Sequence, residues 1–200
     1  VYVVSQKGAY VYDEGISLPA YRDNGSLCKI AANSVYFYNG TDPYYAYTTV
    51  ASINTLDMEF PIQTATFLLG SSSTVYCSAE YLYLTTSGYS ETGVHMIKLD
   101  NGSIVGVADG TVPGWVLNQF SMDENDGYFR IATTVGHAWG AATSKNNVYV
   151  LDQNMTVVGE LEDLAPGEQI YSARFMGDRL YLVTFKKVDP LFVIDLSEPT

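Results

Sequence analysis

The residues best suited to metal chemistry lie in one acidic segment, Asp123-Glu124-Asn125-Asp126-Gly127. Calcium prefers oxygen ligands, and acidic or amide side chains near a glycine are typical of calcium loops. Asp123, Asn125 and Asp126 are therefore candidate calcium ligands. The spacing of a twelve-residue calcium loop is not kept, because the glycine comes one place early and no closing glutamate follows. The alternative is a tight turn between two strands, in which Asn-Asp-Gly is favoured by backbone conformation alone.

Five aspartates each follow a hydrophobic residue at the end of a strand-like segment, and they recur at intervals of about 43 to 52 residues: Asp13, Asp57, Asp100, Asp152 and Asp195. One interpretation is an arc of carboxylates around a channel, which would hold a cation or repel anions. The alternative is that each carboxylate accepts a hydrogen bond from a backbone N–H two residues on and sets a turn.

The two histidines, His95 and His137, do not form a catalytic pair. His95 begins an apolar strand-like segment, where a structural or surface role is expected. His137 lies beside Trp139 in a long loop that offers an aromatic binding surface. No Gly-x-Ser-x-Gly elbow and no glycine-rich phosphate loop occurs in the sequence,. The sequence therefore predicts no catalytic site.

Cys28 and Cys77 are the only cysteines. Both are expected on second strands of consecutive repeat units. Stacked sheets lie about 10 Å apart, whereas a disulfide needs Cβ atoms about 4 Å apart. Two buried free thiols are the simpler interpretation, and a disulfide is the alternative. Their spacing fits no zinc motif.

These residues must be positioned by strands, because the composition is that of an all-β protein. Hydrophobic residues make up 47% of the 200-residue chain, and 17 residues are tyrosine. Tyrosine, valine, threonine and phenylalanine pack well on a pleated surface. No segment keeps a 3.6-residue apolar period over the length of a helix.

A second recurring feature keeps step with the aspartates. Small or polar residues precede aromatic strands that begin at Val35, Tyr81, Tyr128 and Leu180, again about 48 residues apart. Each unit holds about four short strands, with tight turns such as Asn101-Gly102, a strong hairpin signal. Four strands in a repeat of 40 to 50 residues are typical of a β-propeller blade. We therefore predict a β-propeller of four-stranded antiparallel blades rather than a sandwich.

With strands named A to D from innermost to outermost, the aspartates close the blades. This predicts blades over residues 14–57, 58–100, 101–152 and 153–195, with residues 1–13 forming the C–D hairpin of a preceding blade. The aspartates would then lie at D–A connections near the channel. We expect one propeller domain that is part of a larger ring, with a five-blade ring as the alternative. Uncovered blade faces predict packing against the remaining blades, or self-association.

The net charge of −12 argues against nucleic acid as a partner, because phosphate backbones are bound by surfaces rich in Lys and Arg. No run approaches the 18 apolar residues of a membrane span,.

Three segments near the end of the chain carry a resemblance to a known family: FSMDENDGYFRIATT (120–134), NNVYVLDQNMTVVGELEDLAPGE (146–168) and IYSARFMGDRLYLVTFKKVDPLFVIDLSEP (170–199). They resemble the archaeal and bacterial family of secreted proteins with a C-terminal β-propeller domain. The resemblance covers about the last 85 residues, whereas residues 1–75 match only in general character. It implies an exported or membrane-tethered protein whose propeller is longer than this chain, and it supplies no catalytic residues.

Together these features predict a non-catalytic recognition scaffold, extracellular or in the cell envelope, which binds a protein, peptide or glycan. No cofactor other than calcium is expected. The alternatives are a hydrolase of surface polymers, for which propellers are common hosts, and a structural part of a surface assembly. Exposed tyrosines near residues 41–47 favour the last of these,.

Overall fold

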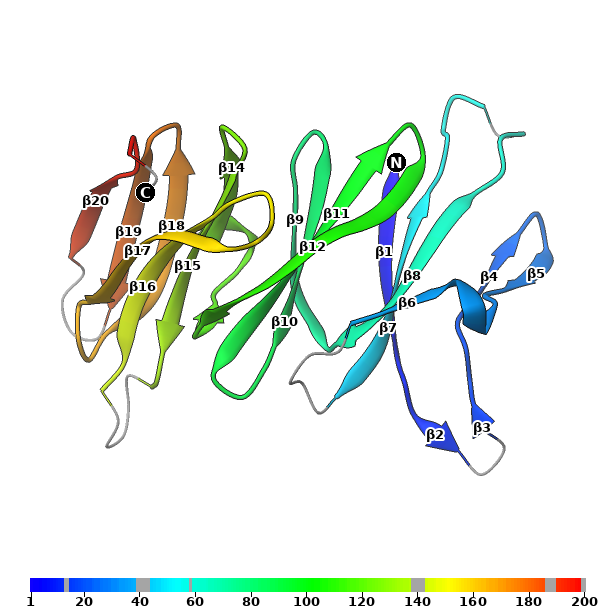
Figure 1. Cartoon of the computed structure of the whole chain (residues 1–200), viewed down its shortest axis with the longest axis horizontal. Coiled ribbons are helices and arrows are strands. Elements are labelled where there is room, and N and C mark those ends of the chain that lie inside the picture. Colours follow the sequence, from blue (N-terminus) through cyan, green and yellow to red (C-terminus); the bar gives the residue numbers. More distant parts are fainter. Residues whose placement is uncertain (13–14, 39–43, 58, 138–142, 186–189, 199–200) are drawn as a thin grey trace.

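The computed structural model describes residues 1–12, 15–38, 44–57, 59–137, 143–185 and 190–198. Within these residues the chain forms sheets that follow one another along the molecule in the order of the sequence (Figure 1). Four sheets stack face to face, and two small hairpins lie beside the first of them. The all-β prediction and the prediction of four-stranded antiparallel blades are confirmed.

The second and third sheets are formed by consecutive strands. The second sheet contains β9 (Ser72–Cys77), β10 (Tyr81–Ser87), β11 (Glu91–Asp100) and β12 (Ser103–Pro113). In the third, a divided first strand is followed by three long ones: β13 (Trp115–Val116), η2 (Gln119–Ser121), β14 (Met122–Asn125), β15 (Tyr128–Val135), β16 (Lys145–Leu151) and β17 (Val157–Leu164). Both β13 and β14 pair with β15.

The two sheets at the ends differ from this pattern. The fourth has three strands, β18 (Gln169–Met176), β19 (Arg179–Phe185) and β20 (Leu191–Asp195). The first has the order β1-β7-β8-β6, formed by β1 (Tyr2–Gly8), β7 (Tyr45–Ser52), β8 (Gln63–Gly70) and β6 (Val35–Phe37), and β6 runs parallel to β8. The hairpins are β2 (Val11–Tyr12) with β3 (Gly15–Ile16) and β4 (Ala20–Asp23) with β5 (Ser26–Lys29), followed by η1 (Ala32–Ser34).

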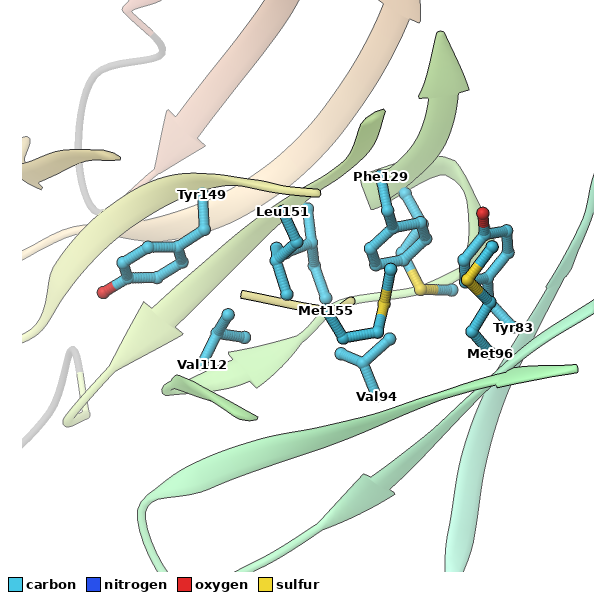
Figure 2. Close-up of a cluster of buried hydrophobic side chains, with 10 residues drawn as sticks. Tyr83, Val94, Met96, Val112, Phe129, Tyr149, Leu151 and Met155 are labelled. Atoms are coloured by element: carbon cyan, nitrogen blue, oxygen red, sulfur yellow. The ribbon is translucent and has the colours of Figure 1, made fainter. Parts of the chain in front are cut away.

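Each pair of neighbouring sheets encloses its own hydrophobic core. The core between the second and third sheets contains the stacked rings of Tyr83 and Phe129, whose centroids are 4.3 Å apart, with Met96 and Met155 beside them (Figure 2). Strands of these two middle sheets are buried on both faces, as the run of buried residues in β16 shows. By contrast, burial alternates along β19 of the fourth sheet, where only one face packs on a described neighbour.

A β-bulge in β12 lets this strand contribute to two cores. Ile97 of β11 pairs with Gly106, but Met96 pairs with Ala108, so Val107 is an extra residue. Because side chains alternate between the faces of a strand, one extra residue exchanges the faces. Ile104 therefore packs toward the first sheet, and Val112 packs toward the third.

The structure places the blade boundaries one strand later than predicted. Asp100 and Asp152 were expected to end blades 58–100 and 101–152, yet the strand after each aspartate pairs antiparallel with the strand before it. The sheets therefore span 72–113 and 115–164. At Asp100 the reason is the Asn101-Gly102 turn, with φ of 47° and 92°, which folds the next strand directly back.

The first sixty residues also depart from the prediction. Instead of turning back within residues 1–13 as a C–D hairpin would, the chain stays extended through Gln6, Lys7 and Gly8 in β1, which pairs with β7. The predicted blade 14–57 is replaced by the two hairpins, η1, β6 and β7. Pairing with the distant strand β7 outweighs the local turn preference, because every residue of β1 gains a partner in the sheet.

Candidate functional site

An open cleft of about 560 Å³ lies between the first strands of three successive sheets. It is lined by β9 of the second sheet, by η2 and β14 of the third, and by β18 of the fourth. We call it the inner-strand cleft. Each of these strands pairs with the next strand of its own sheet, and within the described part of the chain its other edge carries no strand. The cleft thus combines residues that are far apart in the sequence.

The acidic residue that lines the cleft, Asp123, is paired with a buried arginine behind the lining. The guanidinium of Arg130 on β15 forms an ion pair with Asp123 on β14. Arg130 is only 2% exposed and lies over the ring of Phe175, 5.3 Å from its centroid. A buried charge is costly unless it is paired, so the two residues hold each other in place.

Two tyrosine hydroxyls form hydrogen bonds with the acidic residues Asp123 and Glu124 of β14. The Tyr76 hydroxyl lies 3.4 Å from Oδ1 of Asp123 and accepts a hydrogen bond from the backbone N–H of Glu124. The Glu124 side chain turns into the core, where the Tyr83 hydroxyl donates to it at 3.0 Å. Burial is the main cause that raises the pKa of both phenols. They therefore stay protonated donors.

The mouth of the cleft carries an exposed positive charge. Arg174 projects from β18, and its guanidinium carbon lies 3.5 Å from the centroid of the Phe120 ring. Phe120 belongs to η2, which Asn118 caps by accepting a hydrogen bond from the Phe120 N–H. The guanidinium donates a hydrogen bond to the carbonyl of Ala173 at 3.4 Å. Among the described residues, Arg174 has no carboxylate within ion-pairing distance.

One cysteine lines the same cleft. Cys77, at the end of β9, is exposed and forms no disulfide; its thiol donates to the carbonyl of Ser78 at 3.3 Å, and desolvation raises the pKa of the thiol. Cys28 lies on β5, in a hairpin outside the stacked sheets, and is also a free thiol. The prediction that both cysteines lie on second strands of blades is wrong, because Cys77 is on the first strand of its sheet and Cys28 is in a separate hairpin. The two cysteines form no disulfide.

The acidic segment predicted to bind calcium forms a hairpin turn beside the cleft. Asn125 pairs with Tyr128, and Asp126 and Gly127 between them have φ of 50° and 79°, as a two-residue turn requires. Asp123 is held by Arg130, and the Asn125 amide donates to Asp126. Within the described residues, no group of three or more His, Cys, Asp or Glu side chains could hold a metal ion. Calcium binding here stays a prediction.

The recurring aspartates are not brought together near the cleft. Asp100 and Asp195 end third strands, and Asp152 follows one. After Asp100 and Asp152 the chain enters the fourth strand of the same sheet, so these two do not lie at D–A connections. Three of the carboxylates accept backbone hydrogen bonds from two residues on: Asp57 from Glu59, Asp152 from Asn154 and Asp195 from Ser197. This geometry supports the turn-setting interpretation. Asp13 lies outside the described residues.

The two histidines have different surroundings. His137 is exposed and stacks on Trp115, with centroids 5.6 Å apart, whereas Trp139 lies outside the described residues. His95 is buried on β11, where its Nδ1 lies 2.6 Å from Oδ1 of Asp109 and its Nε2 lies 3.2 Å from the Thr86 hydroxyl. Thr86 is 5% exposed, whereas the Asp109 side chain is 44% exposed, and His95 and Asp109 line a small pocket of about 160 Å³ together with Tyr38. A structural role for His95 stays a prediction.

Sequence reasoning missed the residues of the inner-strand cleft. Arg174 interrupts the apolar pattern of its strand, in Tyr-Ser-Ala-Arg-Phe, and that isolated basic residue was the available signal. The sequence around Phe120 carried no such signal, because the role of Phe120 in the cleft comes from its contact with Arg174, 54 positions later in the chain.

The comparisons with known proteins agree with this architecture. A family model described as "Beta propeller domain" matches residues 1–200. The chain belongs to this family. The propeller is 48% identical over 111 residues to an uncharacterized protein of Methanocaldococcus jannaschii, which covers 56% of the chain and 17% of that relative. It is 48% identical over 89 residues to an uncharacterized protein of Archaeoglobus fulgidus, covering 44% of the chain and 13% of the relative. The propeller therefore matches only a small part of each relative.

Two solved structures are similar over most of the propeller. Cobalt-substituted Synechocystis ACO has a TM-score of 0.48 and 11% identity, with coverage of 98% of this chain and 48% of that chain. A subtype N10 neuraminidase-like protein of A/little yellow-shouldered bat has a TM-score of 0.41 and 14% identity, with coverage of 76% and 50%. In the described part of the propeller, no helix is long and apolar enough to cross a membrane.

Proposed function

We propose that this propeller is a non-catalytic recognition module of an exported protein, and that it binds an extended peptide segment of a protein partner in the inner-strand cleft. The observation that carries the proposal is the cleft itself, of about 560 Å³, whose walls are strands paired on one side only. The open edge of a strand offers backbone N–H and C=O groups, with which an extended peptide can pair. Side-chain pockets then provide specificity.

The chemistry of the lining supports binding rather than turnover. The carboxylate of Asp123 is committed to Arg130, and Glu124 is turned into the core by Tyr83. Burial also raises the pKa of the Cys77 thiol, which disfavours the reactive thiolate. A hydrolase of surface polymers stays the alternative, and it would be favoured by release of reducing ends from a polysaccharide incubated with the protein.

Export is supported by the resemblance of residues 120–134, 146–168 and 170–199 to secreted propeller proteins. The test is to treat intact cells of the source organism with a protease and detect the propeller with an antibody. Loss of the antibody signal without lysis supports a surface location. Full protection would contradict it.

The two cysteines provide a direct test of the cleft. Cys77 lines the cleft, and Cys28 lies on the separate β4–β5 hairpin. In a Cys28→Ser background, a bulky maleimide on Cys77 should abolish binding to an array of short synthetic peptides. The matched control is the same label on Cys28 in a Cys77→Ser background, which should bind as the unlabelled protein does. Equal binding by both labelled proteins would contradict the proposed site, and binding to an oligosaccharide array instead would identify a glycan as the partner.

Further blades of the same protein, or a second copy, are proposed to cover the outer face of the fourth sheet. Exposed apolar residues there include Tyr171, Phe185, Leu191 and Val193. Large exposed apolar patches favour association. Light scattering at high protein concentration should therefore show a mass above the 22.0 kDa of one chain, and a monomer would contradict association of this chain with itself.

A further inference from the structure

We infer that the bound peptide carries a carboxylate that pairs with Arg174 at the mouth of the inner-strand cleft. This inference rests on the peptide-binding function proposed above and names the group that is recognised. The carboxylate belongs to an acidic side chain or to the C-terminus of the peptide, because both present the same two oxygens.

Arg174 is held ready for such a ligand. Its guanidinium lies on the face of Phe120 at 3.5 Å from the ring centroid, and stacking on an aromatic face leaves the N–H groups at the edge of the guanidinium able to bind. Phe120 is itself fixed, because Asn118 caps the short helix η2 that carries it. A preorganised side chain loses less conformational freedom when a ligand binds.

The charge of Arg174 is also available, unlike that of the other arginine nearby. Arg130 is buried and paired with Asp123, and Glu124 is bonded to Tyr83 in the core. Among the described residues, Arg174 has no acidic partner. In a chain with 22 acidic and 10 basic residues, Arg174 thus brings an uncompensated positive charge to the inner-strand cleft.

A carboxylate fits this site better than a phosphate group. One guanidinium can bind both oxygens of a carboxylate through two parallel hydrogen bonds. A phosphate monoester carries nearly two negative charges, and proteins usually bind it with a cluster of arginines. Here a single unpaired arginine is flanked by Asp123, which lines the same cleft.

The experiment uses an array of short peptides, each in three matched forms. One form has a central glutamate and an amidated C-terminus, the second has glutamine at that position and is also amidated, and the third has the glutamine and a free C-terminal carboxylate. We expect either carboxylate form to bind about tenfold to a hundredfold more tightly than the neutral form, the range for hydrogen bonds between charged groups. Comparison of the first and third forms shows which source of carboxylate is used.

Variants of the protein connect the effect to Arg174. In Arg174→Gln, the preference for the carboxylate forms should fall to about one, and binding of the neutral form should be unchanged. Arg174→Lys should keep only part of the preference, because an ammonium group cannot bind both oxygens in a fixed geometry. The matched control, Arg22→Gln, removes an exposed arginine from the β4–β5 hairpin and should keep the full preference. Circular dichroism of each variant confirms folding.

The outcomes distinguish the inference from the function on which it rests. If the wild-type protein binds the neutral and carboxylate forms equally, the carboxylate is not recognised, while peptide binding stands. If phosphorylated peptides bind more tightly than the carboxylate forms, the inference is also overturned. If no peptide binds above the level of the Cys77-labelled protein, the proposed function itself fails. Should Arg174→Gln not fold, the Arg174 side-chain N–H resonance of the wild-type protein must shift when a carboxylate peptide is added.

Discussion

Replacement of Gly110 by alanine tests how closely the second and third sheets approach. Gly110 lies on β12, after the bulge, and faces the turn between β16 and β17. A Cβ atom added there would lie 2.8 Å from the Cβ of Met155 and closer still to its carbonyl oxygen. Met155 is 4% exposed, and its turn is tied down because Asp152 accepts hydrogen bonds from the N–H groups of Asn154 and Thr156, both at 2.9 Å. The turn therefore cannot move aside freely.

The expected cost follows from the atoms that must shift. Overpacking a filled core costs about 1–3 kcal/mol, and alanine recovers about 0.5–1 kcal/mol relative to glycine in a strand. We therefore expect Gly110→Ala to lower the free energy of unfolding by about 1–2 kcal/mol. For a chain of this size that corresponds to a fall in Tm of about 2–8 °C. The measurement is urea denaturation followed by circular dichroism, together with a thermal melt.

The matched control lies on the same strand. A Cβ at Gly106 would be 3.2 Å from Cε1 of Phe67, a ring edge that can give by a few tenths of an ångström. Alanine restricts the unfolded chain more than glycine does, and this stabilisation offsets the cost of the close contact with Phe67. Gly106→Ala should therefore change the free energy of unfolding by less than about 1 kcal/mol. If the two variants are equally stable, the β16–β17 turn does not press on β12, and the bulge does not direct the two glycines to opposite sheets.

The other predictions concern the polar groups. A double-mutant cycle of His95→Gln and Asp109→Asn, measured by urea denaturation, should give a coupling of about 0.5–3 kcal/mol, and additive effects would show that the 2.6 Å contact contributes nothing. The backbone N–H of Thr156 is the main cause that lowers the pKa of Asp152, so its contribution is present above the ordinary aspartate pKa and is lost as the pH falls through the lowered value. Asp152→Asn should therefore make Tm less sensitive to acid below about pH 4, and a parallel pH profile would refute this. Calcium binding at residues 123–127 predicts that excess EDTA lowers Tm, whereas an unchanged Tm would remove the calcium hypothesis and leave Asp123 as the ion-pair partner of Arg130 alone.

The sequence alone determined the class of fold and many of its local turns. Alternating aromatic and β-branched residues predict strands, and the structure has strands at each predicted aromatic start, from Val35 to Leu180. Asn101-Gly102 and Asp126-Gly127 form the turns that their residue types favour, with positive φ at both positions of each. These features depend on neighbours in the chain, so the sequence carries them directly.

The partners of the strands were decided only by the tertiary structure. The local pattern around Asp100 marks the end of a strand, but it does not say whether the next strand belongs to the same sheet. The bulge at Val107 was also decided by tertiary packing, because it lets β12 contribute side chains to two hydrophobic cores. It also places Asp109 opposite His95. Without that extra residue the register would place Ala108 there.

The inner-strand cleft shows the same division most clearly. Arg174 stands out in the sequence only as an isolated basic residue and Phe120 not at all, and their stacking depends on β18 and η2, from successive sheets, meeting in space. Asp123, the leading metal candidate by sequence, is instead paired with a buried arginine across its own hairpin. Strand periodicity is set by neighbouring residues, whereas the site is set by the packing of whole sheets, which no local pattern records.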